Sequence, residues 1–209
     1  MEKIFQMSAK TFYGFEDILC EELKKINAID VIKSNRIVHF KGDKELMYKA
    51  NLCLRTALKI LIPLKNKRVL NYEALYKFAF DFEWENYFHK DSSFYINSVC
   101  FGKDFTHSLY VSQRVKDGIV DRYRKIKGSR PNVEKFKPDI YIDVHIDKKL
   151  CTFSLNSSGR NLNQRGYRKK TNEAPLNEVL AAGLILLSNW NKKDDFLDPM
   201  CGSGTFLFE

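Results

Sequence analysis

The chain has 209 residues, of which 44% are apolar and 13% aromatic, so it is not a disordered chain and can form a hydrophobic core. Lys and Arg number 35 against 26 Asp and Glu, which gives a net charge of +9. No apolar run approaches the roughly 18–20 residues that a membrane-spanning helix needs. The composition predicts one large or two small globular domains. The positive charge fits nucleic acid, an anionic membrane surface, or no partner at all.

The amino terminus and the cysteines indicate the compartment. Residues 1–8 contain no apolar stretch of signal-peptide length and no small-residue cleavage site, so secretion is not expected. Five cysteines lie too far apart in the sequence for a C-x-x-C zinc or redox motif. The four histidines have no cysteine or carboxylate partner at ligand spacing, so no metal site is expected. The sequence predicts a cytoplasmic protein with reduced thiols.

The first part of the chain predicts a small α+β unit. Apolar residues at steps of three and four from Phe15 to Ile26 predict an amphipathic helix, whose apolar face is broken only by Glu22. A second amphipathic helix is expected to begin after Asp43 as its N-cap. Short strands are expected over residues 3–8, 36–40 and 57–64.

The middle of the chain predicts a second α+β unit. Helices are expected over 71–82 and 111–126, the second with Gly128 as its stop signal. Phe94 to Phe101 has the composition of a strand. Apolar and polar residues alternate from Ile140 to Asp147, which predicts a half-buried strand that pairs back with residues 151–155 as a hairpin. The implied architecture is a set of antiparallel strands with helices covering one face.

Positive charge is concentrated in two segments. Residues 103–137 contain ten Lys or Arg and four Asp or Glu, and residues 160–170 contain five Lys or Arg and no acid. Together the two segments carry more than the whole net charge. The helix expected over 111–126 presents its basic residues opposite its apolar face, namely Arg114, Arg122, Arg124 and Lys125. Such a face is either a solvated helix surface or a set of phosphate contacts.

The carboxyl-terminal part has the order of elements that begins a nucleotide-binding fold, namely a strand, a glycine turn and the start of a helix. A strongly apolar helix is expected over 176–190, followed by a short apolar strand over 195–198 and a turn with Gly202 and Gly204. Glycines permit a tight turn and a close approach of the ligand, and Asp198 can accept hydrogen bonds from a ligand's hydroxyl or ammonium groups. A P-loop would need a lysine after Gly204, and a hydrolase elbow would need G-x-S-x-G, so both are excluded.

The run from Asp198 to Thr205, DPMCGSGT, resembles motif I of class I S-adenosylmethionine-dependent RNA methyltransferases that carry a THUMP domain. These enzymes include the bacterial 23S rRNA guanine-N2 methyltransferases. Further segments are similar to the same family in the same order. They are FYGFE at 12–16 for its ferredoxin-like segment, DFEWE at 81–85 and RVKDGIVD at 114–121 for its THUMP domain, and SG at 158–159, RGYR at 165–168 and APLNE at 174–178 before its catalytic domain.

This resemblance implies an α+β fold in three parts. They are an N-terminal ferredoxin-like unit over 1–65, a THUMP RNA-binding domain over 66–156, and the start of an α/β Rossmann-like methyltransferase domain over 157–209. The family's Asn/Asp-Pro-Pro-aromatic motif, which holds the target amino group, is not in the chain, so no catalytic residue is expected here. The implied activity of the longer protein is methyl transfer from S-adenosylmethionine to guanine N2 of 23S rRNA. The chain alone is expected to bind structured RNA without catalysis.

The resemblance also assigns candidate site residues. Those expected at the cofactor S-adenosylmethionine, whose site is expected to be incomplete in this chain, are Asp198, Pro199, Gly202, Ser203, Gly204 and Thr205. Those expected at RNA are Arg114, Arg122, Arg124, Lys125, Lys127, Arg130, Arg165 and Arg168.

Several alternatives stay open. Residues 160–170 can instead be a flexible basic linker, Tyr167 can stack a base or fill the domain junction, and the aromatic residues of 78–88 are expected to be core rather than base-stacking. For the whole chain, the alternatives are a stand-alone THUMP RNA-binding module and a THUMP enzyme of tRNA modification.

Overall fold

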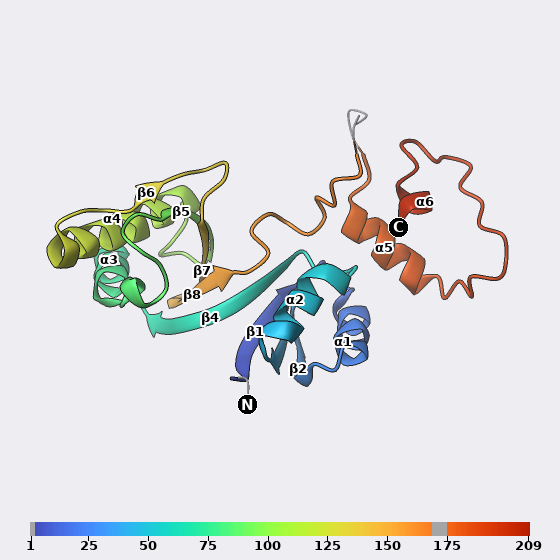
Figure 1. Cartoon of the computed structure of the whole chain (residues 1–209), viewed down its shortest axis with the longest axis horizontal. Coiled ribbons are helices and arrows are strands. Elements are labelled where there is room, and N and C mark those ends of the chain that lie inside the picture. The colour runs from blue at the N-terminus through green and yellow to red at the C-terminus, as the bar shows by residue number, and fades with distance from the viewer. Residues whose placement is uncertain (1–2, 169–174) are drawn as a thin grey trace. The chain divides into compact units, whose positions relative to one another are not determined.

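The computed structural model describes residues 3–168 and 175–209 (Figure 1). The chain divides into two compact units, one formed by residues 1–61 with 160–209 and the other by residues 62–159. Lys169 and Lys170 of the predicted basic segment, and Ala174 of the APLNE run, lie outside the described residues. Within the described part, the search for helices long and apolar enough to cross a membrane found none.

The first unit begins with a β-α-β-β-α-β order. Its strands form an antiparallel sheet in the order β2-β3-β1-β4, the arrangement of a ferredoxin-like fold. Buried apolar residues of the sheet and of the first helix, among them Met7, Phe40 and Leu19, form its core. The elements are β1 (Phe5–Lys10), α1 (Glu16–Lys25), β2 (Ile29–Ser34), β3 (Ile37–Gly42), α2 (Lys44–Cys53) and β4 (Lys59–Arg68).

Most of these elements were predicted, with two differences. The Asp43 side chain accepts a hydrogen bond from the Leu46 N–H at 2.8 Å, which confirms it as the N-cap of α2. Strand β2 was not predicted, because all its residues but one are exposed and the sequence shows no alternation there. Strand β4 continues to Arg68, past the predicted end at 64. Pairing with β1 ends at Leu61, so the missing N–H of Pro63 breaks no bond of that ladder.

The second unit contains the 10-residue helix α3, the 20-residue helix α4 and a mixed sheet. The Asn71 side chain accepts from the Ala74 N–H at 2.8 Å and caps α3, and Gly128 ends α4 in the left-handed conformation at φ +67°. The sheet order is β4-β8-β7-β5-β6. The further elements are α3 (Tyr72–Asp81), a 3-10 turn η1 (Trp84–Asn86), β5 (Ser93–Phe101), α4 (Ser108–Lys127), β6 (Asn132–Val133), β7 (Ile140–Asp147) and β8 (Leu150–Asn156).

The expectation of purely antiparallel strands was wrong for this sheet. Strand β5 pairs with β7 in parallel, from Phe94 opposite Ile140 to Phe101 opposite Asp147, and β6 is also parallel to β5. The connection between the two strands explains the parallel pairing. After β5, helix α4 carries the chain back to the end of the sheet where β5 starts, and β7 then runs in the same direction as β5. The predicted hairpin of β7 and β8 is antiparallel, as expected.

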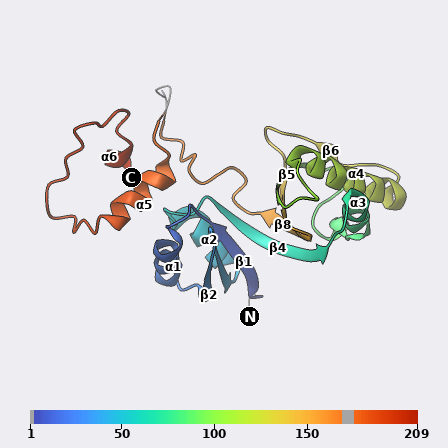
Figure 2. The ribbon, with the colours of Figure 1, turned by 180° about the vertical axis from the view of Figure 1, so that it is seen from behind.

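Helices α3 and α4 lie side by side in both ribbon views (Figures 1 and 2). The predicted aromatic core is confirmed in part: Phe78, Phe82, Trp84 and Phe88 are buried in one cluster with Phe153, whereas Phe80 is half-buried and Tyr87 is exposed. The helices approach each other closely at Gly118, where an added Cβ would lie 2.8 Å from both the Tyr76 carbonyl oxygen and the Ala79 Cβ.

Two further helices complete the first unit. Helix α5 (Glu178–Leu187) begins at Asn177, whose side chain accepts from the Leu180 N–H, and α6 (Thr205–Phe208) follows the glycine turn. Residues 195–198 form no strand, contrary to the prediction. The apolar pattern remains, but no ladder pairs with this segment in the described part, and a single strand without a partner leaves its backbone groups unsatisfied.

Candidate functional site

The glycine turn after Asp198 is closed by short-range hydrogen bonds. The Asp198 Oδ1 atom accepts from the Met200 N–H at 3.1 Å, and the Gly204 N–H donates to the Cys201 carbonyl at 2.7 Å. Gly202 and Gly204 have φ values of +52° and +72°, in the left-handed region that side chains disfavour. Glycine at both positions therefore lets the chain turn within a few residues and start α6.

The surface of this turn is open to a ligand. A Cβ built on Gly202 would meet nothing nearer than the Met200 carbonyl oxygen at 4.0 Å, so a ligand can approach the backbone closely. The Asp198 Oδ2 atom accepts no hydrogen bond from a described residue and is free for a hydroxyl or ammonium donor. These features fit a cofactor such as S-adenosylmethionine, which has ribose hydroxyls and an ammonium group.

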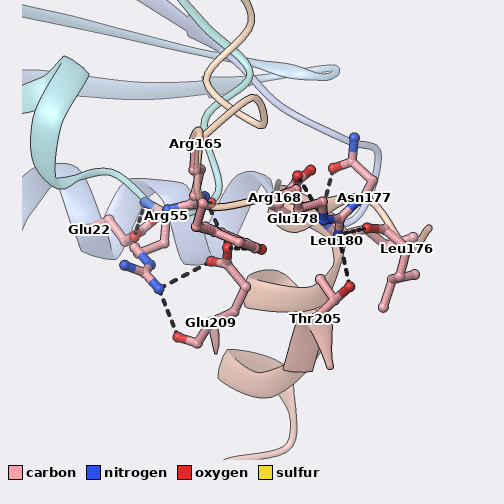
Figure 3. A network of polar contacts seen from close by, with 11 residues as sticks. Glu22, Arg55, Arg165, Arg168, Leu176, Asn177, Glu178, Leu180, Thr205 and Glu209 are labelled. Atoms are coloured by element: carbon pink, nitrogen blue, oxygen red, sulfur yellow. Dashed lines mark hydrogen bonds and ion pairs between the residues drawn. The ribbon is translucent and has the colours of Figure 1, made fainter. Parts of the chain in front are cut away.

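Thr205 differs from the other predicted cofactor residues because it is buried and its hydroxyl is already bonded. The Arg168 Nη2 atom donates to Thr205 Oγ1 at 2.8 Å and to the Leu176 carbonyl at 2.5 Å (Figure 3). Arg168 Nε lies 3.4 Å from Glu178 Oε1 at the start of α5. Arg168 thus joins the beginning of α6 to the beginning of α5 and fixes the end of the glycine turn.

A second cluster, the Glu209 cluster, consists of Glu209 with Arg55 and Arg165, which Figure 3 shows, and of Tyr167. The fully buried Glu209 side chain accepts from Arg55 Nη2 at 3.1 Å and from the Tyr167 hydroxyl at 3.0 Å. Arg165 Nε lies 3.2 Å from Glu209 Oε1 but is not aligned for a hydrogen bond, so this contact is an ion pair. Burial lowers the pKa of Arg165, and the Glu209 charge opposes that shift.

The Glu209 cluster connects the glycine-turn region to the ferredoxin-like part of the same unit. Arg165 Nη2 donates to the Arg55 carbonyl at 2.8 Å. Glu22 of α1 accepts from the backbone N–H groups of Arg55 and Thr56 at 2.8 and 3.0 Å, and also from the Thr56 hydroxyl. A chain of polar contacts therefore runs from α1 through the loop between α2 and β4 to the end of α6.

Sequence reasoning missed Glu22, Arg55 and Glu209 as parts of this site. Glu22 carried a usable signal, because it was the one acid on the apolar face of a predicted helix. Arg55 and Glu209 carried none, since 154 positions separate them. Tyr167 stacks on Phe208 with ring centroids 5.0 Å apart and bonds Glu209, so its ring and hydroxyl both have partners within the chain.

The arginines of α4 in the second unit are largely paired with acids. Arg122 bonds Glu85 through two nitrogens and donates to the Phe80 carbonyl at 3.1 Å. Arg114 pairs with Glu73 at 2.8 Å and lies over the Tyr76 ring at 4.7 Å. Arg122 holds the pKa of Glu85 below its usual range, despite the opposing effect of burial.

The carboxyl-terminal end of α4 is different, because its cations are exposed. Arg124 makes a 3.3 Å contact with Asp121 but remains mostly exposed. Lys125 lies 5.4 Å from the Phe80 ring centroid. Among the described residues, neither Lys127 nor Arg130 forms an ion pair with an acid. Of the predicted RNA residues, the structure thus leaves the cationic groups of these four available for phosphate.

Three family models match the chain in series. The RlmL ferredoxin-like domain matches residues 6–61, the THUMP domain matches 70–156, and the RMKL-like methyltransferase domain matches 165–209. The matched order is that of the three parts predicted from the sequence motifs. The fold class, an α+β chain with ferredoxin-like, THUMP and methyltransferase segments, is thereby confirmed.

Solved structures agree with these matches. A predicted N6-adenine-specific DNA methylase from Listeria monocytogenes str. 4b F2365 is 29% identical with a TM-score of 0.83, over 98% of this chain and 54% of its own. SMU.472, assigned as a methyltransferase and complexed with SAH, is 31% identical with a TM-score of 0.81, over 99% of this chain and 54% of its own. A possible methylase from Clostridium difficile 630 is 28% identical with a TM-score of 0.83, over 98% and 54%.

This chain therefore spans about half the length of these relatives. It combines an RlmL ferredoxin-like domain, a THUMP domain and the first part of an RMKL-like methyltransferase domain.

Proposed function

We propose that this chain is the RNA-binding portion of a methyltransferase that transfers a methyl group from S-adenosylmethionine to guanine N2 of 23S rRNA. The observation that carries the proposal is the succession of RlmL ferredoxin-like, THUMP and RMKL-like methyltransferase matches in one chain. The SAH complex of SMU.472 supports the choice of cofactor. The choice of guanine N2 rests on the resemblance of the motifs at 158–205 to that family.

In this proposal the glycine turn binds the cofactor. S-adenosylmethionine would supply the activated methyl group. Asp198 would accept hydrogen bonds from its hydroxyl or ammonium groups, and the backbone at Gly202, Ser203 and Gly204 would hold it. Pro199 and Thr205 border the turn, with Thr205 held by Arg168. Arg165 and Arg168 support the turn rather than present free cations, and no residue of this chain is assigned a catalytic role.

The THUMP unit binds the RNA in this proposal. Phosphate contacts come from the exposed cations at the end of α4, and they position the RNA without reading its sequence. The guanidinium groups of Arg114 and Arg122 are paired with Glu73 and Glu85 and are less available to phosphate. The predicted domain limits, 1–65, 66–156 and 157–209, and a cytoplasmic location remain part of the proposal.

The charge-reversal variant Arg124→Glu with Lys125→Glu tests RNA binding. We expect weaker binding to a 23S rRNA fragment and a shallower dependence of affinity on salt, by about 0.7–0.9 in the log–log slope for each phosphate that is no longer neutralised. Lys25→Glu with Lys44→Glu changes the net charge equally in the other unit, at two exposed lysines, and is the matched control. Equal affinity and slope for the test variant and the unaltered chain would refute the assignment.

The reaction is tested with the longer protein that contains this chain. Unmodified 23S rRNA, tRNA and DNA are each incubated with labelled S-adenosylmethionine, and the modified nucleosides are identified by mass spectrometry. We expect N2-methylguanosine in the rRNA. N6-methyladenine in DNA, the product suggested by the description of the Listeria relative, would overturn the proposed substrate, as would a product found in tRNA alone.

A further inference from the structure

We infer that Phe136, between Lys135 and Lys137, is a stacking site for one unpaired RNA base. This inference rests on the proposed RNA binding of the THUMP unit and assigns one residue within it. Phe136 has 79% of its surface exposed, the largest fraction for an aromatic residue in the described part of the chain. Its two neighbours in the sequence are both exposed lysines.

The ring of Phe136 is free, whereas other exposed rings of the second unit have partners. Tyr87 stacks on Phe82, Tyr110 contacts Tyr72, and Phe101 contacts His145. Within residues 3–168 and 175–209, no aromatic ring and no cation lies against the ring of Phe136. An exposed aromatic face without a partner is a surface on which a base can stack, because every base has a π face.

The segment that carries Phe136 is fixed at both ends. At the start, Asn132 and Val133 pair with β5, and the Glu134 N–H donates to the Phe94 carbonyl at 3.1 Å. At the end, Asp139 accepts from the N–H and hydroxyl of Ser93 at 2.7 and 2.8 Å. Residues 135–137 between these anchors therefore form a short bend that holds the ring outward, so that little conformational entropy is lost when a base stacks on it.

The charges of this segment favour an anionic partner. Both of its acids are bonded to the protein, because Glu134 accepts from the Phe136 N–H at 2.8 Å and Asp139 is bonded to Ser93. In the part of the chain that the structure describes, Lys135 and Lys137 form no ion pair with an acid. An aromatic ring with a free cation on each side matches a nucleotide, whose base stacks while the adjoining phosphates contact the lysines. A duplex offers the phosphates but no free base.

The test compares two RNA probes of equal length, a hairpin with an unpaired loop and a fully paired duplex. We expect Phe136→Ala to weaken binding of the hairpin roughly tenfold, with the salt slope unchanged, and to leave duplex binding unaltered. Phe136→Trp should retain hairpin affinity, and the fluorescence of the introduced indole should be quenched when the hairpin binds. Phe101→Ala removes another exposed ring of the same unit and is the matched control.

The outcomes separate this inference from the proposed function. Hairpin binding that is equal for Phe136→Ala and the unaltered chain overturns the stacking site but leaves RNA binding by the unit intact. Equal losses for hairpin and duplex also overturn it, since they indicate a general change of the surface. If the unaltered chain binds neither probe, both the proposed function and the stacking site fail.

Discussion

The arginines of residues 165–168 and those of helix α4 are alike in the sequence but differ in their surroundings. Arg165 and Arg168 are only 17% and 14% exposed, and each faces a glutamate of the same unit. In α4, by contrast, Arg122 is paired and mostly buried, whereas Arg124 and the lysines after it lie in solvent. A count of basic residues therefore locates positive charge, but burial and pairing decide which charges can reach a phosphate.

The difference follows from the cost of removing charge from water. A buried guanidinium loses its hydration and must regain the lost free energy from an acid and from carbonyl acceptors. Arg165 and Arg168 have both kinds of partner, so their charge is used within the protein. The exposed cations of α4 remain hydrated, and in the proposed RNA binding their contact with phosphates would release the surrounding counterions and so drive association.

The largest effect is expected from Arg165→Met, which removes one of the two guanidiniums facing the buried Glu209. We expect the free energy of unfolding of the first unit to fall by about 2–3 kcal/mol, toward the lower end for a broken buried pair because Arg55 and Tyr167 remain. Hydrogen exchange followed by mass spectrometry measures the loss in each unit separately, and it should appear in residues 1–61 and 175–209.

Arg160→Met is the control for this variant. Arg160 belongs to the same basic segment but is exposed and forms no ion pair in the described residues, so its loss should change stability by less than about 0.5 kcal/mol. Similar effects of the two variants would mean that the segment behaves as a uniform basic linker, and the contrast between buried and exposed arginines would fail.

A smaller loss of stability is expected from two glycine substitutions, one in each unit. In Gly118→Ala the new methyl group would lie 2.8 Å from a backbone oxygen of α3, so the second unit should lose about 1–2 kcal/mol although alanine favours a helix. In Gly183→Ala the methyl group of α5 would overlap the buried ring of Phe15 in the first unit. Denaturation followed by hydrogen exchange should place each loss in its own unit. A loss spread over both units would contradict the division of the chain.

Local signals in the sequence predicted the individual elements well. The cap at Asp43 and the stop at Gly128 are confirmed, because each depends on residues within one helical turn. The parallel pairing of β5 with β7 was not predicted, because the composition of a strand does not indicate whether the neighbouring strand runs parallel or antiparallel to it.

The candidate site was predictable to a smaller extent. The glycine turn lies within eight consecutive residues and could be located from the sequence, and its role in cofactor binding stays a prediction. The polar contacts that support it join residues as distant as Glu22, Arg55 and Glu209, which no periodicity or motif brings together. The exposure of Phe136 likewise depends on where β5 and β6 fix its segment, which is a property of the folded sheet.

The smallest effect is expected from Glu85→Gln. This variant tests whether Arg122 of α4 is stabilised by its ion pair, in contrast to the exposed Arg124. Hydrogen bonds from Arg122 lower the pKa of Glu85 in the folded chain, so the unfolded chain binds more protons between the two pKa values. The stabilisation is thus complete above the unfolded pKa of about 4.3 and is lost as the pH falls through the lower folded value.

Denaturation of Glu85→Gln should show a free energy of unfolding that is lower by about 1 kcal/mol at pH 7 and that declines less as the pH is lowered. Glu83→Gln, at an exposed acid that forms no ion pair with an arginine in the described residues, is the control. An acid decline that is the same in Glu85→Gln and in the unaltered chain would show that Arg122 gains nothing from its pair and is as available to RNA as Arg124.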